Sequence, residues 1–300
     1  MAKAKPFVKW VGGKSQLIEQ LEALLPADFD RKQNVTYIEP FVGGGAMLFY
    51  MLQTHTNITS AIINDINPDL ITCYEVVKNN PKELIESLSH IQNQYYSLKD
   101  EALRKDFFLQ NRDRFNTKHL NKIENTTLFF FLNRTCFNGL YRVNKAGKFN
   151  VPFGKYTMPT ICDPYTILAD SAVLQRVEIL TGDFEQTIEK INGNTFFYFD
   201  PPYRPLSNTS NFNDYTKESF NDDAQIRLKK FCDKIQKFDN VQFLLSNSDC
   251  KAKDDKDCFF DDLFTDYKIN RVWASRSVNA NGTKRGKLTE LAIQNYSNVI

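Results

Sequence analysis

The chain has 300 residues, of which 42% are hydrophobic and 25% are charged, and its formal net charge is +2. This composition is typical of a globular protein with one large domain or two smaller ones, and no repeat or low-complexity tract is visible. Because no apolar run reaches the length of a membrane span, no signal peptide is visible and the six cysteines form no C-x-x-C pair, we expect a cytoplasmic protein with free thiols and no membrane attachment.

The stretch FVKWVGGKSQL at residues 7–17 contains Gly-Lys-Ser, as a phosphate-binding loop does. That loop requires a glycine five residues before Gly13, and it must follow a β-strand. Val8 occupies that position, and the preceding segment from Met1 to Pro6 does not resemble a strand. A nucleotide hydrolase is therefore disfavoured, and the rest of the chain must indicate what this loop holds.

Strand-like and helical patterns alternate in the next segment. Residues 35–52 begin as an apolar strand, turn at glycines and continue as an apolar helix. Residues 60–65 are a second apolar strand, and a helix is predicted from about Pro68 to Lys78. Continuous apolar runs are typical of parallel strands that are buried on both faces.

The pattern changes at Pro81. Residues 81–133 are predicted to be helical and rich in charge and aromatic rings, and residues 134–160 form a predicted loop or hairpin rich in Gly, Asn and Lys. Further strands are predicted at 177–183, 195–203, 241–248, 267–274 and 288–296, the last two flanking a loop at 275–287. Strands that alternate with helices predict a doubly wound α/β sheet, and residues 76–162 interrupt it as an inserted module.

The sequence EPFVGGGA at residues 39–46 places glycines at the end of the first predicted strand. Glycines there let the backbone approach a ligand closely, in the crevice beyond the carboxyl end of the strand. Asp65 ends the next strand, where a carboxylate can accept hydrogen bonds from ribose hydroxyls. A glycine turn followed by a helix-capping Asp would give the same residues, so this pair of signals is weak alone.

The sequence FFYFDPPY at residues 196–203 is more specific. Consecutive prolines cannot continue a central strand, so they hold the backbone rigid where the strand ends. Asp200 and the carbonyl of Pro201 then become two acceptors in fixed positions, which suit an amino group with two N–H donors. Tyr203 offers a face on which a flat ring can stack.

Basic residues are unevenly distributed along the chain. Residues 1–18, 125–162 and 267–289 each contain several Lys or Arg and no Asp or Glu. Three such windows predict a positive surface that faces a polyanion such as nucleic acid.

Together these motifs resemble those of the DNA adenine-N6 methyltransferases that use S-adenosylmethionine, in the order cofactor motif, recognition domain, catalytic motif. The resemblance is closest to the Dam methylase and to the GATC-modifying methylases of restriction–modification systems, and it covers nearly the whole chain. Further matching segments are KWVGGK at 9–14, NDIN at 64–67, NRTCFNGLYRVNKAGKFNVPFGKY at 133–156, GDF at 182–184, LLSNS at 244–248 and RGKLTEL at 285–291.

The resemblance implies a Rossmann-like methyltransferase sheet, formed by residues 1–75 and 163–300, that binds the cofactor and performs catalysis. Residues 76–162 would form a mainly helical DNA-recognition domain that carries a basic hairpin or loop. The implied catalytic residues are Asp200, Pro201, Pro202 and Tyr203. The implied cofactor-binding residues are Trp10, Lys14, Glu39, Phe41, Gly43, Gly45, Asp65, Asp183, Phe184 and Asp200, and no metal is required.

In the implied reaction, an adenine flips out of the duplex and stacks on Tyr203. Asp200 and the Pro201 carbonyl would accept the two hydrogens of its amino group and localise the lone pair of the nitrogen. The DNA-binding residues carried over from the family are Lys9, Arg134, Phe137, Asn138, Leu140, Arg142, Pro152, Tyr156, Lys284, Arg285 and Lys287.

Among these DNA-binding residues, Phe137 would wedge into the base stack, Asn138 and Leu140 would touch bases, and Arg142 would read guanine. The family often has tyrosine where this chain has Phe137. A basic hairpin that merely grips phosphates would show the same composition.

We therefore expect a monomer that acts on double-stranded DNA at GATC and that is paired with a restriction endonuclease. Four alternatives stay open. A ribosomal RNA methylase usually carries Asn before the two prolines and lacks the insert, and a cytosine-N4 methylase more often begins the motif with Ser. The other two are an adenine methylase with another target site and a catalytically silent DNA-binding regulator. The latter would need a decayed cofactor loop or DPPY motif, and both are intact here.

Overall fold

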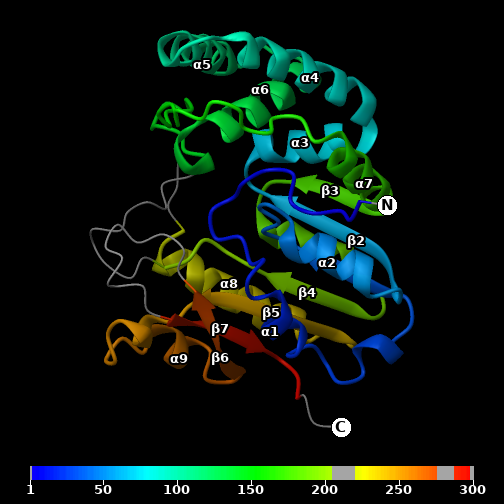
Figure 1. Cartoon of the computed structure of the whole chain (residues 1–300). Coiled ribbons are helices and arrows are strands. Elements are labelled where there is room, and N and C mark those ends of the chain that lie inside the picture. Colours follow the sequence, from blue (N-terminus) through cyan, green and yellow to red (C-terminus); the bar gives the residue numbers. More distant parts are fainter. Residues whose placement is uncertain (1, 205–219, 276–286, 298–300) are drawn as a thin grey trace.

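The computed structural model describes residues 2–204, 220–275 and 287–297. In these residues the central sheet has the order β3-β2-β1-β4-β5-β7-β6 (Figure 1). Its strands are β1 (Val35–Glu39), β2 (Ile58–Asp65), β3 (Val177–Thr181), β4 (Thr195–Phe199), β5 (Val241–Ser248), β6 (Lys268–Ser275) and β7 (Lys287–Gln294). Strands β1 to β5 pair in parallel, whereas β7 lies antiparallel between β5 and β6.

Helices cover both faces of this sheet, which confirms the predicted doubly wound architecture. The helices are α1 (Ile18–Glu22), α2 (Ala46–Thr54), α3 (Pro68–Asn79), α4 (Pro81–Ser97), α5 (Glu101–Phe115), α6 (Lys122–Thr135), α7 (Pro164–Leu174), α8 (Asp222–Ile235) and α9 (Phe259–Leu263). Short 3-10 turns lie at Phe29–Arg31, Phe137–Gly139, Phe184–Lys190 and Cys250–Ala252.

Successive residues of each strand enter two different hydrophobic clusters, because side chains alternate across a strand. Tyr37 and Phe196 pack on the face covered by α1, α2, α3 and α7. Ile38 and Phe197, which follow them in β1 and β4, pack on the face covered by α8 and α9. Burial on both faces explains why these strands are apolar throughout.

Strand β4 ends at Phe199, four residues earlier than the predicted run of 195–203. The difference has a simple cause: Pro201 and Pro202 lack an N–H and cannot extend the ladder. Asp200 therefore lies just beyond the carboxyl end of a central strand.

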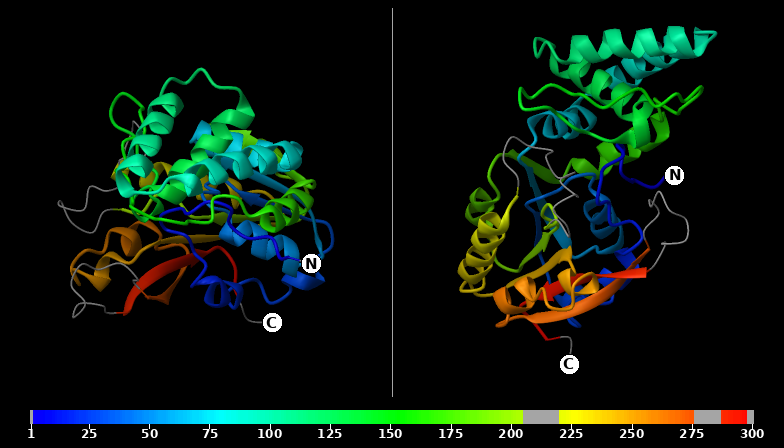
Figure 2. Two further views of the ribbon diagram at one scale, coloured as in Figure 1. Left: turned by 45° about the horizontal axis from the view of Figure 1, so that its top comes forward. Right: turned by 90° about the vertical axis from the view of Figure 1, so that its left-hand side faces the viewer.

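The helices predicted in residues 81–133 are present as α4, α5 and α6 (Figures 1 and 2). Helices α4 and α6 pack against α3, and α5 packs against α6. Residues 136–153 form the predicted hairpin, with antiparallel bridges between Cys136 and Phe153 and between Val143 and Phe149. One continuous core cluster includes residues of this module and of the sheet domain. The boundaries of a separate domain at 76–162 stay a prediction.

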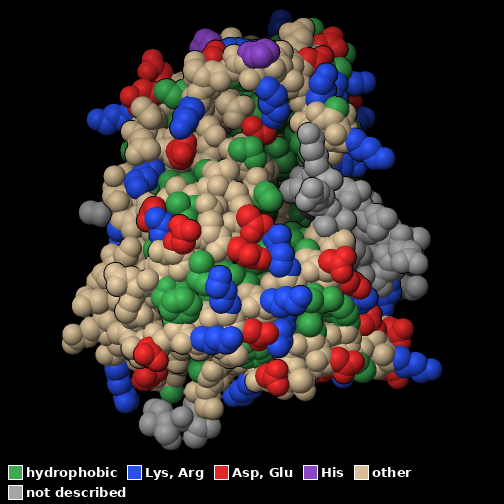
Figure 3. Space-filling view, turned by 180° about the vertical axis from the view of Figure 1, so that it is seen from behind, with side chains coloured by type: hydrophobic (Ala, Val, Ile, Leu, Met, Phe, Trp, Pro, Cys, Tyr) green, Lys and Arg blue, Asp and Glu red, His purple; other side chains and the backbone are tan. Residues whose placement is uncertain are grey.

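Acidic and basic side chains are interspersed on the face opposite to that of Figure 1 (Figure 3). That face does not present a surface of a single sign. None of the described helices is long and apolar enough to span a membrane.

Candidate active site

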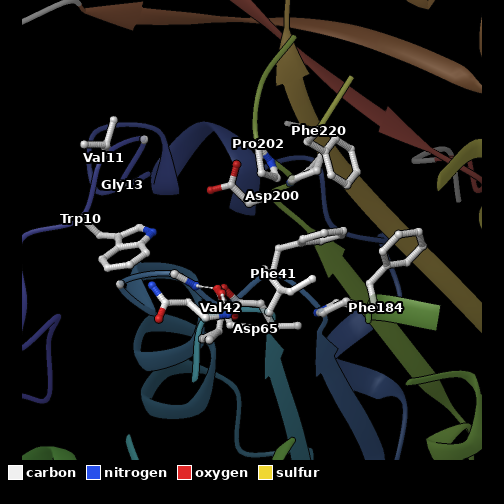
Figure 4. A pocket seen from close by; sticks show the side chains of 18 of the residues that line it. Trp10, Val11, Gly13, Phe41, Val42, Asp65, Phe184, Asp200, Pro202 and Phe220 are labelled. Atoms are coloured by element: carbon white, nitrogen blue, oxygen red, sulfur yellow. Dashed lines mark hydrogen bonds between the residues drawn. The ribbon is translucent and has the colours of Figure 1, made fainter. Parts of the chain in front are cut away.

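A pocket of ≈ 1380 Å³ opens where the carboxyl ends of β1, β2 and β4 meet the N-terminal segment (Figure 4). It exceeds the roughly 300–1,000 Å³ of a usual small-molecule site. Trp10 and Val11 lie at one side of it, the rings of Phe41 and Phe184 lie at the other, and Asp200 points into the space between them. Ligands of open α/β sheets bind at this edge of the strands.

The glycine loop after β1 has a conformation that only glycine adopts easily. Gly43 has φ 48° and Gly45 has φ 73°, both in the left-handed region. The hydroxyl of Tyr74 donates to the Gly43 carbonyl over 3.0 Å, and a Cβ at Gly45 would lie 2.5 Å from that hydroxyl. A Cβ at Gly43 would lie 2.8 Å from the Trp10 ring. The loop therefore needs glycine for both its conformation and its close packing.

Gly45→Ala should lower the free energy of unfolding and weaken ligand binding in the pocket. The left-handed conformation costs an alanine roughly 1–2 kcal/mol, and the clash with Tyr74 adds about 1–3 kcal/mol. Gly147→Ala is the matched control, because Gly147 also has φ 73° but has no atom within 4 Å of its would-be Cβ. Denaturant titration of both variants measures the difference. Equal losses in the two variants would contradict the role given to the Tyr74 contact.

Asp65 closes the glycine loop onto β2. Its carboxylate accepts the backbone N–H of Gly43 over 3.1 Å and that of Asn67 over 2.9 Å. Burial raises the pKa of Asp65 to about 6, although both N–H donors oppose the shift. The structure places Asp65 beside the glycine loop, and its binding of a ribose stays a prediction.

Three aromatic rings form one end of the pocket. The ring centroid of Phe41 lies 5.2 Å from that of Phe184 and 5.6 Å from that of Phe220. Asp183 lies beside them in an ion pair with Arg227, whose guanidinium is 4.7 Å from the Phe184 ring. A flat heterocycle would find ring faces and a carboxylate acceptor there.

Glu39 lies at the bottom of the same pocket and is 2% exposed. It accepts a hydrogen bond from the Tyr37 hydroxyl over 2.9 Å. Burial raises its pKa well above the usual range, which favours a neutral carboxyl group.

Lys14 reaches the DPPY motif from the N-terminal segment. Its Nζ lies 2.9 Å from Asp200 Oδ1 and 4.3 Å from the centroid of the Tyr203 ring, and it donates to the Gly12 carbonyl over 2.8 Å. The Lys14 side chain is only 5% exposed. The structure therefore places this ammonium against the DPPY motif.

Glu290 of β7 is a residue of this site that the sequence analysis did not assign. Its Oε2 accepts the Tyr203 hydroxyl over 2.5 Å and lies 3.9 Å from Lys14 Nζ. Burial raises the pKa of Asp200 to about 6, Lys14 lowers it and Glu290 raises it. An acid within the apolar pattern of β7 is the signal that could have found Glu290.

Gln225 was also missed, and it holds the backbone of the DPPY motif. Its Nε2 donates to the Pro202 carbonyl over 3.1 Å, and its Oε1 accepts from Asn247 Nδ2 over 3.0 Å. Ser248 Oγ donates to the Arg204 carbonyl over 3.2 Å. Gln225 occupies the apolar face of α8 together with Leu228 and is fully buried, and a polar residue on such a face is a usable signal.

The structure brings several predicted DNA-binding residues together beside the N-terminal segment. Lys9 Nζ lies 5.4 Å from the centroid of the Tyr156 ring. Phe137 is 52% exposed, as a wedge requires. Asn138 has φ 55° at the tip of the turn, and Pro152 accepts the N–H of Phe137 over 2.9 Å.

Other predicted DNA-binding residues have partners within the protein. Arg142 donates from Nε to Asn150 Oδ1 over 2.8 Å, and Arg134 donates from Nη2 to the Phe7 carbonyl over 2.7 Å. Leu140 packs partly buried against the core. Lys284, Arg285 and the side chain of Lys287 lie outside the described part of the chain.

Residues 10–278 match the family described as D12 class N6 adenine-specific DNA methyltransferase. The chain belongs to this family. The resemblance noted in the sequence is thereby confirmed, and with it the reaction class: this D12-class enzyme methylates adenine N6 in DNA. No cluster of three His, Cys, Asp or Glu that could hold a metal occurs in the described residues.

Curated relatives match the D12-class chain over nearly its whole length. It is 47% identical to the type II methyltransferase M.MjaIII of Methanocaldococcus jannaschii, with 98% of this chain and 100% of the relative covered. It is 36% identical to the type II methyltransferase M1.LlaDCHI of Lactococcus lactis subsp. cremoris, with 98% and 96% covered. It is 35% identical to the DNA adenine methylase of Haemophilus influenzae, with 96% and 93% covered.

Proposed function

We propose that this methyltransferase uses S-adenosylmethionine to methylate the adenine of GATC in double-stranded DNA, after the base has flipped into the pocket. The observation that carries the proposal is one pocket that contains a glycine loop, an aromatic end and the DPPY motif. Its volume can accept a nucleoside-sized cofactor and a flipped base together.

The residues of the pocket fit the parts of S-adenosylmethionine. Phe41, Phe184 and Asp183 would hold its adenine, and Asp65 would accept its ribose hydroxyls. The close approach of Trp10 to Gly43 would cover its methionine end. When bound, this cofactor supplies an electrophilic methyl group on a positively charged sulfur.

The catalytic contribution of the protein is to position and polarise the amino group of the target. Asp200 and the Pro201 carbonyl accept its two hydrogens, which localises the lone pair on N6. Asp200 Oδ1 lies 2.9 Å from the Lys14 ammonium, and an ionised carboxylate has about four acceptor sites, so Asp200 can accept an amino hydrogen while this ion pair stays in place. After N6 gains the methyl group it loses one proton, for which the Asp200 carboxylate is the adjacent acceptor.

Incubation with tritiated-methyl S-adenosylmethionine and duplex DNA tests the proposal directly. Digestion to nucleosides should place the label on N6 of deoxyadenosine in duplexes that contain GATC. A duplex with the same composition and no GATC is the control. Label on N4 of deoxycytidine would contradict the proposed activity. Equal labelling of both duplexes would contradict the proposed site.

Arg142→Ala should relax the choice of base at the guanine next to the target adenine. A bidentate arginine–guanine pair discriminates by about 1–3 kcal/mol, which is roughly 5–150-fold. Asn150 Oδ1 accepts from Arg142 Nε over 2.8 Å, and this bond would orient the guanidinium for such a contact. Competition assays with GATC and singly substituted duplexes measure the discrimination.

Lys148→Ala is the matched control for Arg142, because Lys148 is an exposed cation of the same hairpin. Lys148→Ala should weaken binding to all DNA sequences alike and flatten the salt dependence of binding. If Arg142→Ala discriminated the guanine position as well as the parent does, Arg142 would not be a base-reading residue.

The remaining proposals concern partners. Helices α4 to α6 and the hairpin would form the DNA-recognition domain, and the enzyme would act as a monomer on one strand at a time. The type II designation of two relatives supports a functional pairing with a restriction endonuclease.

A further inference from the structure

We propose that Asn133 couples DNA recognition to cofactor binding. It would do so by fixing the recognition turn, residues 137–142, to the N-terminal segment around Trp10 that would cover the cofactor. The inference rests on the proposed function, because it takes residues 137–142 as the DNA-reading turn and Trp10 as part of the cofactor site. In this inference Asn133 is a positioning residue that acts on both the DNA-reading turn and the cofactor site.

The side-chain amide of Asn133 makes three hydrogen bonds to the backbone of two segments that lie far apart from each other in the sequence. Its Oδ1 accepts the N–H of Lys9 over 2.8 Å, and its Nδ2 donates to the Lys9 carbonyl over 2.9 Å. Nδ2 also donates to the Gly139 carbonyl over 2.9 Å. Asn133 is 2% exposed, so water cannot readily replace these bonds.

Two further contacts join the N-terminal segment to α6 and to the recognition turn. Arg134, the next residue of α6, donates to the Phe7 carbonyl over 2.7 Å. Gly139 has φ 66°, and a Cβ there would collide with the Lys9 side chain. The recognition turn and the N-terminal segment are therefore packed directly against each other.

Trp10, the residue after Lys9, links these contacts to the proposed cofactor site. The Trp10 ring stacks on the Tyr141 ring, with centroids 5.6 Å apart, and its Cβ would lie 3.1 Å from a Cβ at Gly44. Tyr141 belongs to the recognition segment, and Gly44 to the cofactor loop. A shift of the recognition turn would therefore displace Trp10 from its position against the cofactor loop.

Linkage then requires a reciprocal effect on the two affinities. If DNA fixes the turn in the arrangement that seats Trp10, DNA raises cofactor affinity by a certain factor, and the cofactor raises DNA affinity by the same factor. We define the coupling factor as the ratio of the cofactor Kd without DNA to the Kd with DNA.

Calorimetric titration with S-adenosylhomocysteine, with and without a GATC duplex, measures this coupling factor. The parent should show a factor of about 5 or more, and Asn133→Ala should bring it close to 1. Asn116→Ala is the matched control. Asn116 makes the same two-way amide contact, to the N–H (2.7 Å) and carbonyl (3.0 Å) of Phe149, but it does not bond to the N-terminal segment.

Asn116→Ala should weaken DNA binding through the hairpin and keep the parent's coupling factor. A parent factor near 1, or an unchanged factor in Asn133→Ala, would overturn the inference. If Asn133→Ala does not fold, Arg134→Met removes the second link and should lower the same ratio, and an unchanged ratio there counts equally against it. A parent that binds neither S-adenosylhomocysteine nor GATC duplex would instead refute the proposed function.

Discussion

Asp200→Ala should reduce methyl transfer by about 100-fold or more while leaving much of the cofactor affinity in place. Removing one oriented acceptor from a closed site typically costs two to three orders of magnitude in rate. Asp200 is held for this task by the end of β4, by the rigid prolines and by the Lys14 ion pair at 2.9 Å. The loss should therefore appear in kcat rather than in cofactor Kd.

Single-turnover labelling and calorimetric titration separate these two effects for Asp200→Ala. Asp261→Ala is the control, because it also removes an aspartate that pairs with a lysine, Lys251, but it lies on α9 and does not line the pocket. Turnover of Asp200→Ala within threefold of the parent would exclude Asp200 from the mechanism.

The location of the site could be predicted from the sequence because strand ends and functional motifs coincide in a parallel sheet. Asp65 and Asp200 each follow an apolar run, and the carboxyl ends of parallel strands meet at one edge. The glycine loop and the DPPY motif are local features, so neither requires knowledge of the tertiary structure. The structure brings all of them into one pocket.

The partners of the motifs could not be predicted, because they come from distant parts of the chain. Asn133 bonds to Lys9 across 124 positions, and Glu290 bonds to Tyr203 across 87. The sequence shows which residues are basic, but it does not show what their side chains contact in the folded protein. Arg134 contributes to a basic window, yet it bonds to a backbone carbonyl within the protein.

The acid limb of the pH–rate profile should move in opposite directions when the two charged neighbours of Asp200 are removed. In the proposed reaction Asp200 must be ionised to accept the amino hydrogens. Its pKa is raised to about 6, so the parent should lose activity as the pH falls through about 6. Glu290→Gln removes a charge that raises this pKa, and the limb should move to lower pH. Lys14→Met removes a charge that lowers it, and the limb should move to higher pH.

The position of the limb, rather than the height of the plateau, decides this prediction. Both residues contact the DPPY motif, so either variant can also lower the maximal rate. Below its pKa a single ionisation changes the rate about tenfold per pH unit, so small displacements are measurable. Single-turnover rates from pH 4.5 to pH 8, on the order of eight points per variant, would locate each midpoint. Displacement of both midpoints in the same direction would show that a group other than Asp200 controls the acid limb.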